Sequence, residues 1–143
     1  MLISTKGRYA LRLMVCVASQ KDEYKTSLRE VSEAEDISLK YLEQLARPLV
    51  QSGLLKSVRG KGGGYQLGRL PQEITAGEVL RVVEGTTAPV GCSALEAGIG
   101  CPRSPQCSTV AFWTGLDRLI DDYVNAVTLQ DLVDGSPVPQ ISL

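Results

Sequence analysis

Apolar residues in the first part of the chain recur at the spacing of one helix face. The spacing i, i+3, i+4 and i+7 predicts an amphipathic helix over about residues 5–20. Its apolar positions are Ala10, Leu13, Met14 and Val17. Cys16 lies at the edge of this stripe, where we expect a small, buried hydrophobic side chain. The capping box Ser27–Glu30 should open a second short helix, which ends near residues 35–36.

A third helix is predicted to begin after Ser38, which can act as its N-cap. Ile37 and Leu42 have the spacing of a hydrophobic staple across that helix start. The inward face contains Leu42, Leu45, Ala46 and Leu49, and the outward face contains Lys40, Glu43, Gln44 and Arg47. Pro48 removes one backbone hydrogen bond, so we expect a kink or a loosened last turn before Gly53. Two short helices joined by a turn form a helix-turn-helix.

Two short strands are predicted at 54–58 and 65–67, joined by a loop rich in glycine. A hairpin directly after a helix-turn-helix forms a wing. Its glycines permit positive φ, and Arg59 and Lys61 give it a cationic tip that could enter a minor groove. A nucleotide-binding loop is the alternative. The segment lacks Gly-Lys-Ser/Thr, and Tyr65 stands where the last glycine of GxGxxG would fall, so this alternative is disfavoured.

The second half of the chain predicts a capped helix, a loop and a long helix. The capping box Thr75–Glu78 starts a helix that ends at 84–85, and a Gly/Pro/Ser-rich loop covers about 86–104. The long helix should begin between 104 and 109, and its apolar positions alternate by three and four, as in helices that pack against another helix. They are Trp113, Leu116, Ile120, Tyr123 and Val127. We interpret them as a dimer seam, with intrachain core as the alternative.

These elements predict a mainly α protein with a winged helix-turn-helix domain, a small β-hairpin wing, a cysteine loop and a long C-terminal dimerisation helix. The expected divisions are a DNA-binding domain over 1–84, a sensor loop over 85–107, the dimerisation helix and tail over 108–133, and a flexible C-terminus over 134–143.

Composition is that of a globular protein, with 43% hydrophobic and 22% charged residues. No apolar run approaches the roughly 18 residues of a membrane span, and the N-terminus lacks a signal-peptide layout. We therefore expect a cytoplasmic protein with no membrane partner. In a reducing compartment its 4 cysteines would serve as ligands, redox thiols or core residues more often than as disulfides.

Charge is divided unevenly along the chain. Residues 1–70 contain 12 Lys and Arg against 7 Asp and Glu, whereas residues 71–143 contain 3 against 9. The net charge of -1 thus conceals a basic N-terminal half that could face a phosphate backbone. On the third helix, Gln44 suits an adenine edge, Glu43 can accept from cytosine N4, and Lys40 can reach guanine or a phosphate. The alternative is an ordinary solvated helix face.

Enzymatic function is disfavoured by the residue types present. The chain has no histidine and no evident acid–base pair, so a cysteine nucleophile would lack its usual partner, and no small-molecule substrate is expected. A scaffold that binds protein and not DNA is a further alternative, which would lack salt-dependent DNA affinity.

The sequence resembles the Rrf-type winged-helix regulators over nearly residues 1–133. The blocks that carry the resemblance are Ser4–Ala10, Ile37–Leu45, Ser52–Leu55, Val58–Gly68, Thr75–Val79 and Val127–Leu132. The resemblance implies a homodimer on double-stranded DNA with an imperfect palindrome, the third helix in the major groove and the wing arginine in the minor groove. The predicted DNA-binding residues are Ser38, Lys40, Tyr41, Glu43, Gln44, Arg59 and Lys61. Lys40 stands where the cluster-binding regulators of the family have serine, so operator preference should differ.

The same resemblance bears on the cysteines. Cluster-binding members use three cysteines after the winged domain, which match Cys92, Cys101 and Cys107 as metal ligands and imply an iron–sulfur cluster, with 2Fe-2S slightly favoured over 4Fe-4S. The fourth ligand is unassigned, because the family's histidine position is Val110 and its aspartate position on the first helix is Arg8. Ligation is expected to order the loop. The ordered loop would set the spacing or angle between the two recognition helices, which are the third helices of the two protomers, and so the affinity for the operator.

Three other uses of these cysteines remain open. A structural zinc site would need four ligands and usually paired CxxC spacing, which is absent. A thiol switch would join Cys101 and Cys107 in a disulfide on oxidation. Inert cysteines are disfavoured because the polar loop offers them no buried place. A zinc-responsive or thiol-redox regulator of the same fold is therefore the alternative to a cluster sensor.

Overall fold

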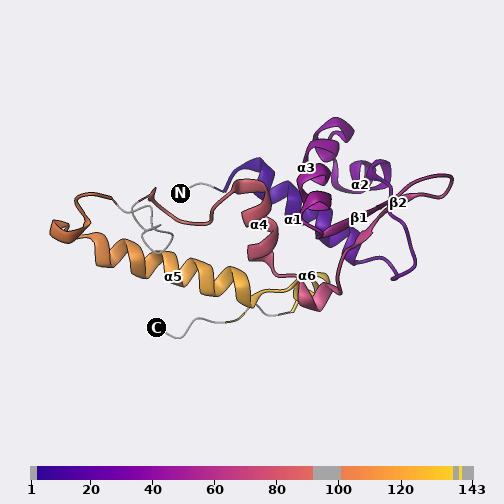
Figure 1. Cartoon of the computed structure of the whole chain (residues 1–143). Helices are drawn as coiled ribbons and strands as arrows, with labels where there is room; N and C mark the ends of the chain where they lie inside the picture. The colour runs from indigo at the N-terminus through magenta and orange to yellow at the C-terminus, as the bar shows by residue number, and fades with distance from the viewer. Residues whose placement is uncertain (1–2, 92–100, 137–138, 140–143) are drawn as a thin grey trace.

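The computed structural model describes residues 3–91, 101–136 and 139 and contains a helical domain from which one long helix projects (Figure 1). Among these residues the elements are α1 (Thr5–Ala18), α2 (Leu28–Glu35), α3 (Leu39–Gln51), β1 (Leu55–Val58), β2 (Gly64–Leu67), η1 (Pro71–Glu73), α4 (Ala76–Glu84), η3 (Ser104–Gln106), α5 (Val110–Ala126) and α6 (Leu129–Asp134). The expected mainly α winged helix-turn-helix architecture is confirmed.

The helix starts follow from the capping residues. Ser4 caps α1, and Ser27 and Glu30 form the reciprocal capping box of α2. The Ser38 hydroxyl accepts from the Tyr41 amide at 3.2 Å and begins α3. This helix continues through Pro48 to Gln51, and the Ser52 amide donates to the Pro48 carbonyl at 3.0 Å. The last turn is therefore closed although Pro48 contributes no donor.

The wing is a two-stranded antiparallel hairpin in which Leu55 pairs with Leu67 and Val58 with Gly64. Thr26, just before α2, pairs with Tyr65 through two backbone hydrogen bonds, which ties the hairpin to the helix-turn-helix. A Cβ at Gly64 would lie 2.7 Å from the Thr26 carbonyl oxygen, so this pairing requires glycine. The hairpin confirms the predicted strands.

One hydrophobic core joins the helices to the wing. Its fully buried members come from both ends of the chain. The largest are Leu13, Met14, Leu42, Leu49, Leu55, Ile74 and Leu129. Cys16 is half-buried and packs against the edge of this core, close to its expected place.

The C-terminal segment departs from the sequence-based expectation. The long helix ends at Ala126, Val127 is extended, and a separate capped helix, α6, follows Thr128. The Ala76 amide donates to the Val127 carbonyl at 2.8 Å, and the Leu129 amide donates to the Ile74 carbonyl at 2.9 Å. The expected place of Val127 in the apolar seam is therefore wrong, because the backbone leaves the helix there and Val127 is buried beside the N-terminal half.

Within the described residues, side-chain contacts join the C-terminal part of the long helix α5 to α4. Arg81 of α4 reaches Asp121 at 3.0 Å and Asn125 at 2.5 Å, and a Cβ at Gly77 would collide with the Asn125 side chain. No residue of α5 is buried, and Trp113 near its other end is half-exposed. Among the residues that the structure describes, none of the helices combines the length and the hydrophobicity of a membrane-spanning segment.

Candidate DNA-binding surface and cysteine pocket

The outer face of α3 carries polar side chains that are free to contact another molecule. Lys40, Glu43 and Gln44 are exposed and make no hydrogen bond or ion pair within the part of the chain that the structure describes. Their places on the first two turns follow from Ser38, which begins the helix, and from the buried stripe on the opposite side. This arrangement presents three different hydrogen-bonding side chains on the first two turns of α3.

Tyr41 has a more restricted position than its neighbours. It is half-buried, its hydroxyl lies 3.2 Å from the Thr5 hydroxyl, and its ring packs edge-to-face against Tyr9 with centroids 5.7 Å apart. Both partners belong to α1. Tyr41 therefore anchors the first turn of α3 to α1, a role that the sequence did not indicate.

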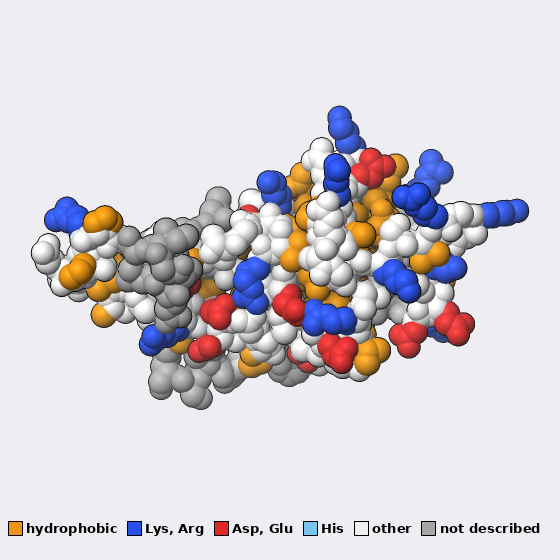
Figure 2. All heavy atoms as spheres, in the orientation of Figure 1, with side chains coloured by type: hydrophobic (Ala, Val, Ile, Leu, Met, Phe, Trp, Pro, Cys, Tyr) orange, Lys and Arg blue, Asp and Glu red, His pale blue; other side chains and the backbone are white. Residues whose placement is uncertain are grey.

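The tip of the wing is cationic. Arg59 and Lys61 are exposed, and both are without a polar partner within the described residues. Gly60 and Gly62 have φ of 99° and 76°, so the tight loop depends on glycine at these positions. Figure 2 shows Lys and Arg side chains projecting from the end of the molecule that carries α3 and the wing. The basic N-terminal half of the sequence thus forms one cationic end of the fold.

Two of the three predicted cysteine ligands share one pocket. Cys101 and Cys107 line a pocket of about 360 Å³ together with Arg103, Thr109 and Trp113. Two backbone hydrogen bonds compact the turn between them, from Ser104 to Cys101 at 2.9 Å and from Cys107 to Ser104 at 3.3 Å. The sequence did not single out Arg103 or Thr109, because no motif marks them, and it placed Trp113 in the apolar seam of the long helix.

The cysteine side chains differ in their chemistry. A hydrogen bond with the Thr109 hydroxyl, 3.3 Å from Sγ, is the main cause that lowers the pKa of Cys107 and favours its thiolate. Burial, followed by the charges of Glu35 and Glu30, raises the pKa of Cys16 and keeps it a thiol. Cys107 is therefore the more suitable ligand or nucleophile of the two.

The third predicted ligand, Cys92, lies outside the described residues, as do parts of the predicted loop and C-terminus. Among the residues that are described, no group of three or more His, Cys, Asp or Glu side chains is placed to hold a metal ion. The structure thus brings Cys101 and Cys107 together and does not describe the complete predicted ligand set.

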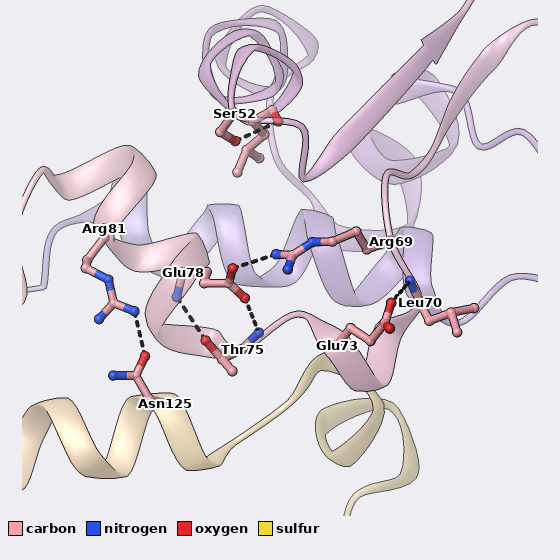
Figure 3. Close-up of polar contacts among 9 residues, drawn as sticks. Ser52, Arg69, Leu70, Glu73, Thr75, Glu78, Arg81 and Asn125 are labelled. Atoms are coloured by element: carbon pink, nitrogen blue, oxygen red, sulfur yellow. Dashed lines mark hydrogen bonds and ion pairs between the residues drawn. The ribbon is translucent and has the colours of Figure 1, made fainter.

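Polar contacts on α4 connect the winged domain to both neighbouring segments. In Figure 3, Glu78 accepts from the Thr75 amide at 3.0 Å and pairs with Arg69, which follows the wing. Arg81, one turn later, reaches Asn125 of α5. At the end of α4, one Glu84 carboxylate oxygen accepts three hydrogen bonds from the first turn of α1. α4 therefore contacts α1, the segment that follows the wing, and α5.

A helix-turn-helix with a cationic wing, joined to a projecting helix with a thiol pocket at its start, defines a winged-helix transcriptional regulator. The family model Rrf2, described as "Iron-dependent Transcriptional regulator", matches residues 3–135, and the chain belongs to this family. The expected family resemblance is confirmed, and the chain is a transcriptional regulator rather than an enzyme.

Relatives of two kinds are similar to this chain. It is 39% identical over 142 residues to the HTH-type transcriptional regulator IscR of Pectobacterium carotovorum subsp. carotovorum (strain PC1), covering 99% of this chain and 85% of the relative. It is 40% identical over 132 residues to the HTH-type transcriptional regulator CymR of Bacillus subtilis (strain 168), covering 92% and 89%. The solved structure of T. potens IscR has a TM-score of 0.75 and 30% identity, covering 100% of this chain and 93% of that one.

Proposed function

We propose that this regulator is a homodimer whose binding to an imperfect DNA palindrome responds to an iron–sulfur cluster held by Cys92, Cys101 and Cys107. The observation that carries the sensing part is the shared pocket of Cys101 and Cys107, in which Cys107 has a lowered pKa. The relatives named IscR and CymR support the regulatory part.

The DNA-reading proposal rests on the exposed face of α3. Glu43 and Gln44 would contact base edges in the major groove, with Lys40 on guanine or a phosphate and with Ser38 and Tyr41 at the backbone beside the helix start. Arg59 and Lys61 would enter the minor groove from the wing. Glu43→Ala should relax base preference in a randomised-site selection. Glu33→Ala removes an exposed carboxylate from α2 and is the control.

The thiols present are chemically suited to an iron–sulfur cluster. Thiolates are the usual ligands of such clusters, and the polar turn from Cys101 to Cys107 offers them to solvent rather than to the core. A bound cluster supplies a group whose assembly, loss or oxidation depends on iron and oxidants. We favour two iron atoms slightly over four and assign no fourth ligand.

The protein's own residues suggest how such a signal could reach DNA. Ligation would fix the turn that precedes α5, and Arg81 would carry the position of α5 to α4. Glu84 joins the end of α4 to the first turn of α1, on which Tyr41 of the recognition helix rests. A change in these successive contacts would alter the angle or spacing of the two α3 helices in a dimer, and with it the affinity for DNA.

A thiol-redox or zinc-responsive regulator of the same fold is the second candidate. It is favoured by the same pocket, because two thiols on one compact turn are placed for a regulatory exchange that needs no cluster. The structure of the similar B. subtilis CymR is that of a protein called the global cysteine regulator. Both candidates predict DNA binding and differ in what occupies the thiols.

One experiment separates the candidates. Protein purified without oxygen would be measured by visible absorption and assayed for iron, sulfide and zinc. A coloured sample with nearly equal iron and sulfide, lost in Cys101→Ser and Cys107→Ser but kept in Cys16→Ser, supports the cluster. A colourless sample with zinc supports a zinc site. A colourless, metal-free sample whose DNA affinity changes on thiol oxidation, in wild type but not in Cys107→Ser, supports the thiol switch.

A further inference from the structure

The first turns of α1 place arginine side chains beside the recognition helix. The Arg8 guanidinium carbon lies 6.0 Å from the centroid of the Tyr9 ring, and that of Arg12 lies 5.5 Å from it. Tyr9 in turn packs against Tyr41 in the first turn of α3. Figure 2 shows Lys and Arg side chains over this part of α1 as well as over α3. The cationic end of the molecule therefore continues from the helix-turn-helix onto α1.

Arg12 has an acidic partner within the described residues, whereas Arg8 has none. Arg12 Nε lies 2.8 Å from Glu35 Oε2, and another of its nitrogens donates to the Glu35 carbonyl, so Arg12 fastens α1 to α2. Arg8 is exposed, and its guanidinium lies against the Tyr9 ring without a hydrogen bond or ion pair to the described residues. Its guanidinium thus keeps its hydrogen-bond donors available while the ring restricts its position.

We propose that Arg8 binds a DNA phosphate next to the recognition helix and so extends the DNA-binding surface onto α1. This inference rests on the proposed DNA binding of α3. When the first turns of a recognition helix enter the major groove, the phosphates that wall the groove pass beside them. Arg8 lies near that region, because its guanidinium is against the Tyr9 ring and the Tyr9 ring packs against Tyr41 in the first turn of α3. A guanidinium matches two phosphate oxygens, and its contact with the ring lowers the entropy lost on binding.

A phosphate contact has a signature that a base contact lacks. Each lost contact should lower the slope of log affinity against log salt by about 1, and it should weaken binding to all sequences alike. In a dimer, Arg8→Ala removes one contact per protomer and should lower the slope by about 2. Glu43→Ala, at a proposed base contact, should instead change sequence preference.

The test uses the full chain and fluorescence anisotropy between about 50 and 200 mM salt. The probes are a duplex selected from a randomised pool and a random-sequence duplex. Arg8→Ala should bind both more weakly and with a shallower slope, and Arg8→Lys should keep a slope near that of wild type. Lys21→Ala removes an exposed cation beyond the other end of α1 and is the matched control.

The outcomes separate this inference from the proposed function. If wild type binds both duplexes with a steep salt dependence but Arg8→Ala behaves as Lys21→Ala does, Arg8 does not contact phosphate. A loss of dimer in Arg8→Ala at equal DNA slope would also overturn the inference, because Arg8 would then pair with the second copy. If wild type shows no salt-dependent affinity, the proposed DNA binding itself fails.

Discussion

Gly7 on α1 shows how a single atom can determine the packing of two helices. A Cβ at this position would lie 2.7 Å from Glu84 Oε1, 2.7 Å from Ile3 Cγ2 and 3.0 Å from a Leu80 methyl group. The missing side chain lets the Glu84 carboxylate approach the Ser4 amide at 2.9 Å and the Gly7 amide at 2.9 Å. The carboxylate thereby satisfies amides at the start of α1 that have no partner within the helix.

Gly7→Ala should therefore destabilise the fold although alanine favours helices. We expect a loss of about 1–3 kcal/mol, because the carboxylate must move away and the crowded contact must open. Gly115→Ala on α5 is the matched control, since its added Cβ would meet no atom of the described residues within 4 Å apart from the backbone of its own helix. That control should gain up to about 1 kcal/mol from helix propensity. Urea unfolding of both variants measures the difference, and an equal stabilisation of both would contradict the crowding.

The charge of Glu84 should make part of this stability depend on pH. Burial raises its pKa, but hydrogen bonds from Ser4 and Gly7 outweigh burial and lower the pKa below its ordinary value. A carboxylate with a lowered folded pKa stabilises the fold above its unfolded pKa of about 4.3 and loses that contribution as pH falls through the folded value.

Glu84→Gln should accordingly unfold more easily than wild type at neutral pH, and the difference should narrow below about pH 4.5. Urea unfolding at a series of pH values measures it. Glu33→Gln, at an exposed carboxylate of α2 without a hydrogen bond in the described residues, should remain close to wild type. A Glu84→Gln difference that stays constant down to acid pH would show that the charge is not what stabilises the contact.

At the scale of elements, α6 is the segment that the sequence least revealed. Val127 continues the three-and-four spacing of α5, and this spacing predicts that it belongs to that helix. The structure separates them with Thr128 and Asp131, which cap α6 reciprocally. This box uses aspartate where the recognised boxes of α2 and α4 use glutamate. The short helix then returns to the N-terminal core, a contact between distant segments that a local pattern cannot predict.

Leu129→Ala tests whether α6 contributes to the free energy of unfolding of the winged domain. Leu129 is 0% exposed and packs in the core with Leu13 and Ile74, so we expect a loss of about 2–5 kcal/mol. Leu70→Ala, at a leucine that is 50% exposed, should cost less than about 1 kcal/mol. Denaturant unfolding measures both. Similar small losses would mean that α6 is not part of the cooperative core.

Helix starts and the hairpin could be predicted from the sequence, because they depend on capping residues and glycines that are close together in the chain. Ser38, Ser27 and Thr75 each begin a helix where the sequence places an N-cap, and the hairpin forms around its glycines. The candidate DNA-binding face also followed from sequence, because a buried stripe on α3 leaves the opposite side chains outside. The anchoring of Tyr41 on α1 could not be predicted, since it depends on how two helices cross.

For the whole molecule, the projecting helix α5 keeps its apolar side chains only partly buried by the described residues. α5 contacts α4 near Asn125, and its seam residues Trp113, Leu116 and Ile120 are half-buried. Figure 1 shows the helix projecting from the domain. Phe112, at the same end, is 64% exposed and packs edge-on against Trp113. An apolar helix face of this length is costly in water, and a second copy of the same helix would cover it.

Ile120→Lys should therefore dissociate the proposed dimer by placing a charge in the middle of this seam. Asp122→Lys introduces the same side chain on the other face of α5, where Asp122 is exposed, and should leave the dimer intact. Sedimentation velocity measures the oligomeric state. Because each palindromic half-site would then be held by one protomer, Ile120→Lys should also lose operator affinity far more than affinity for random DNA. Dissociation of both variants, or of neither, would contradict the seam on α5 and the proposed path from the cysteine pocket to the DNA.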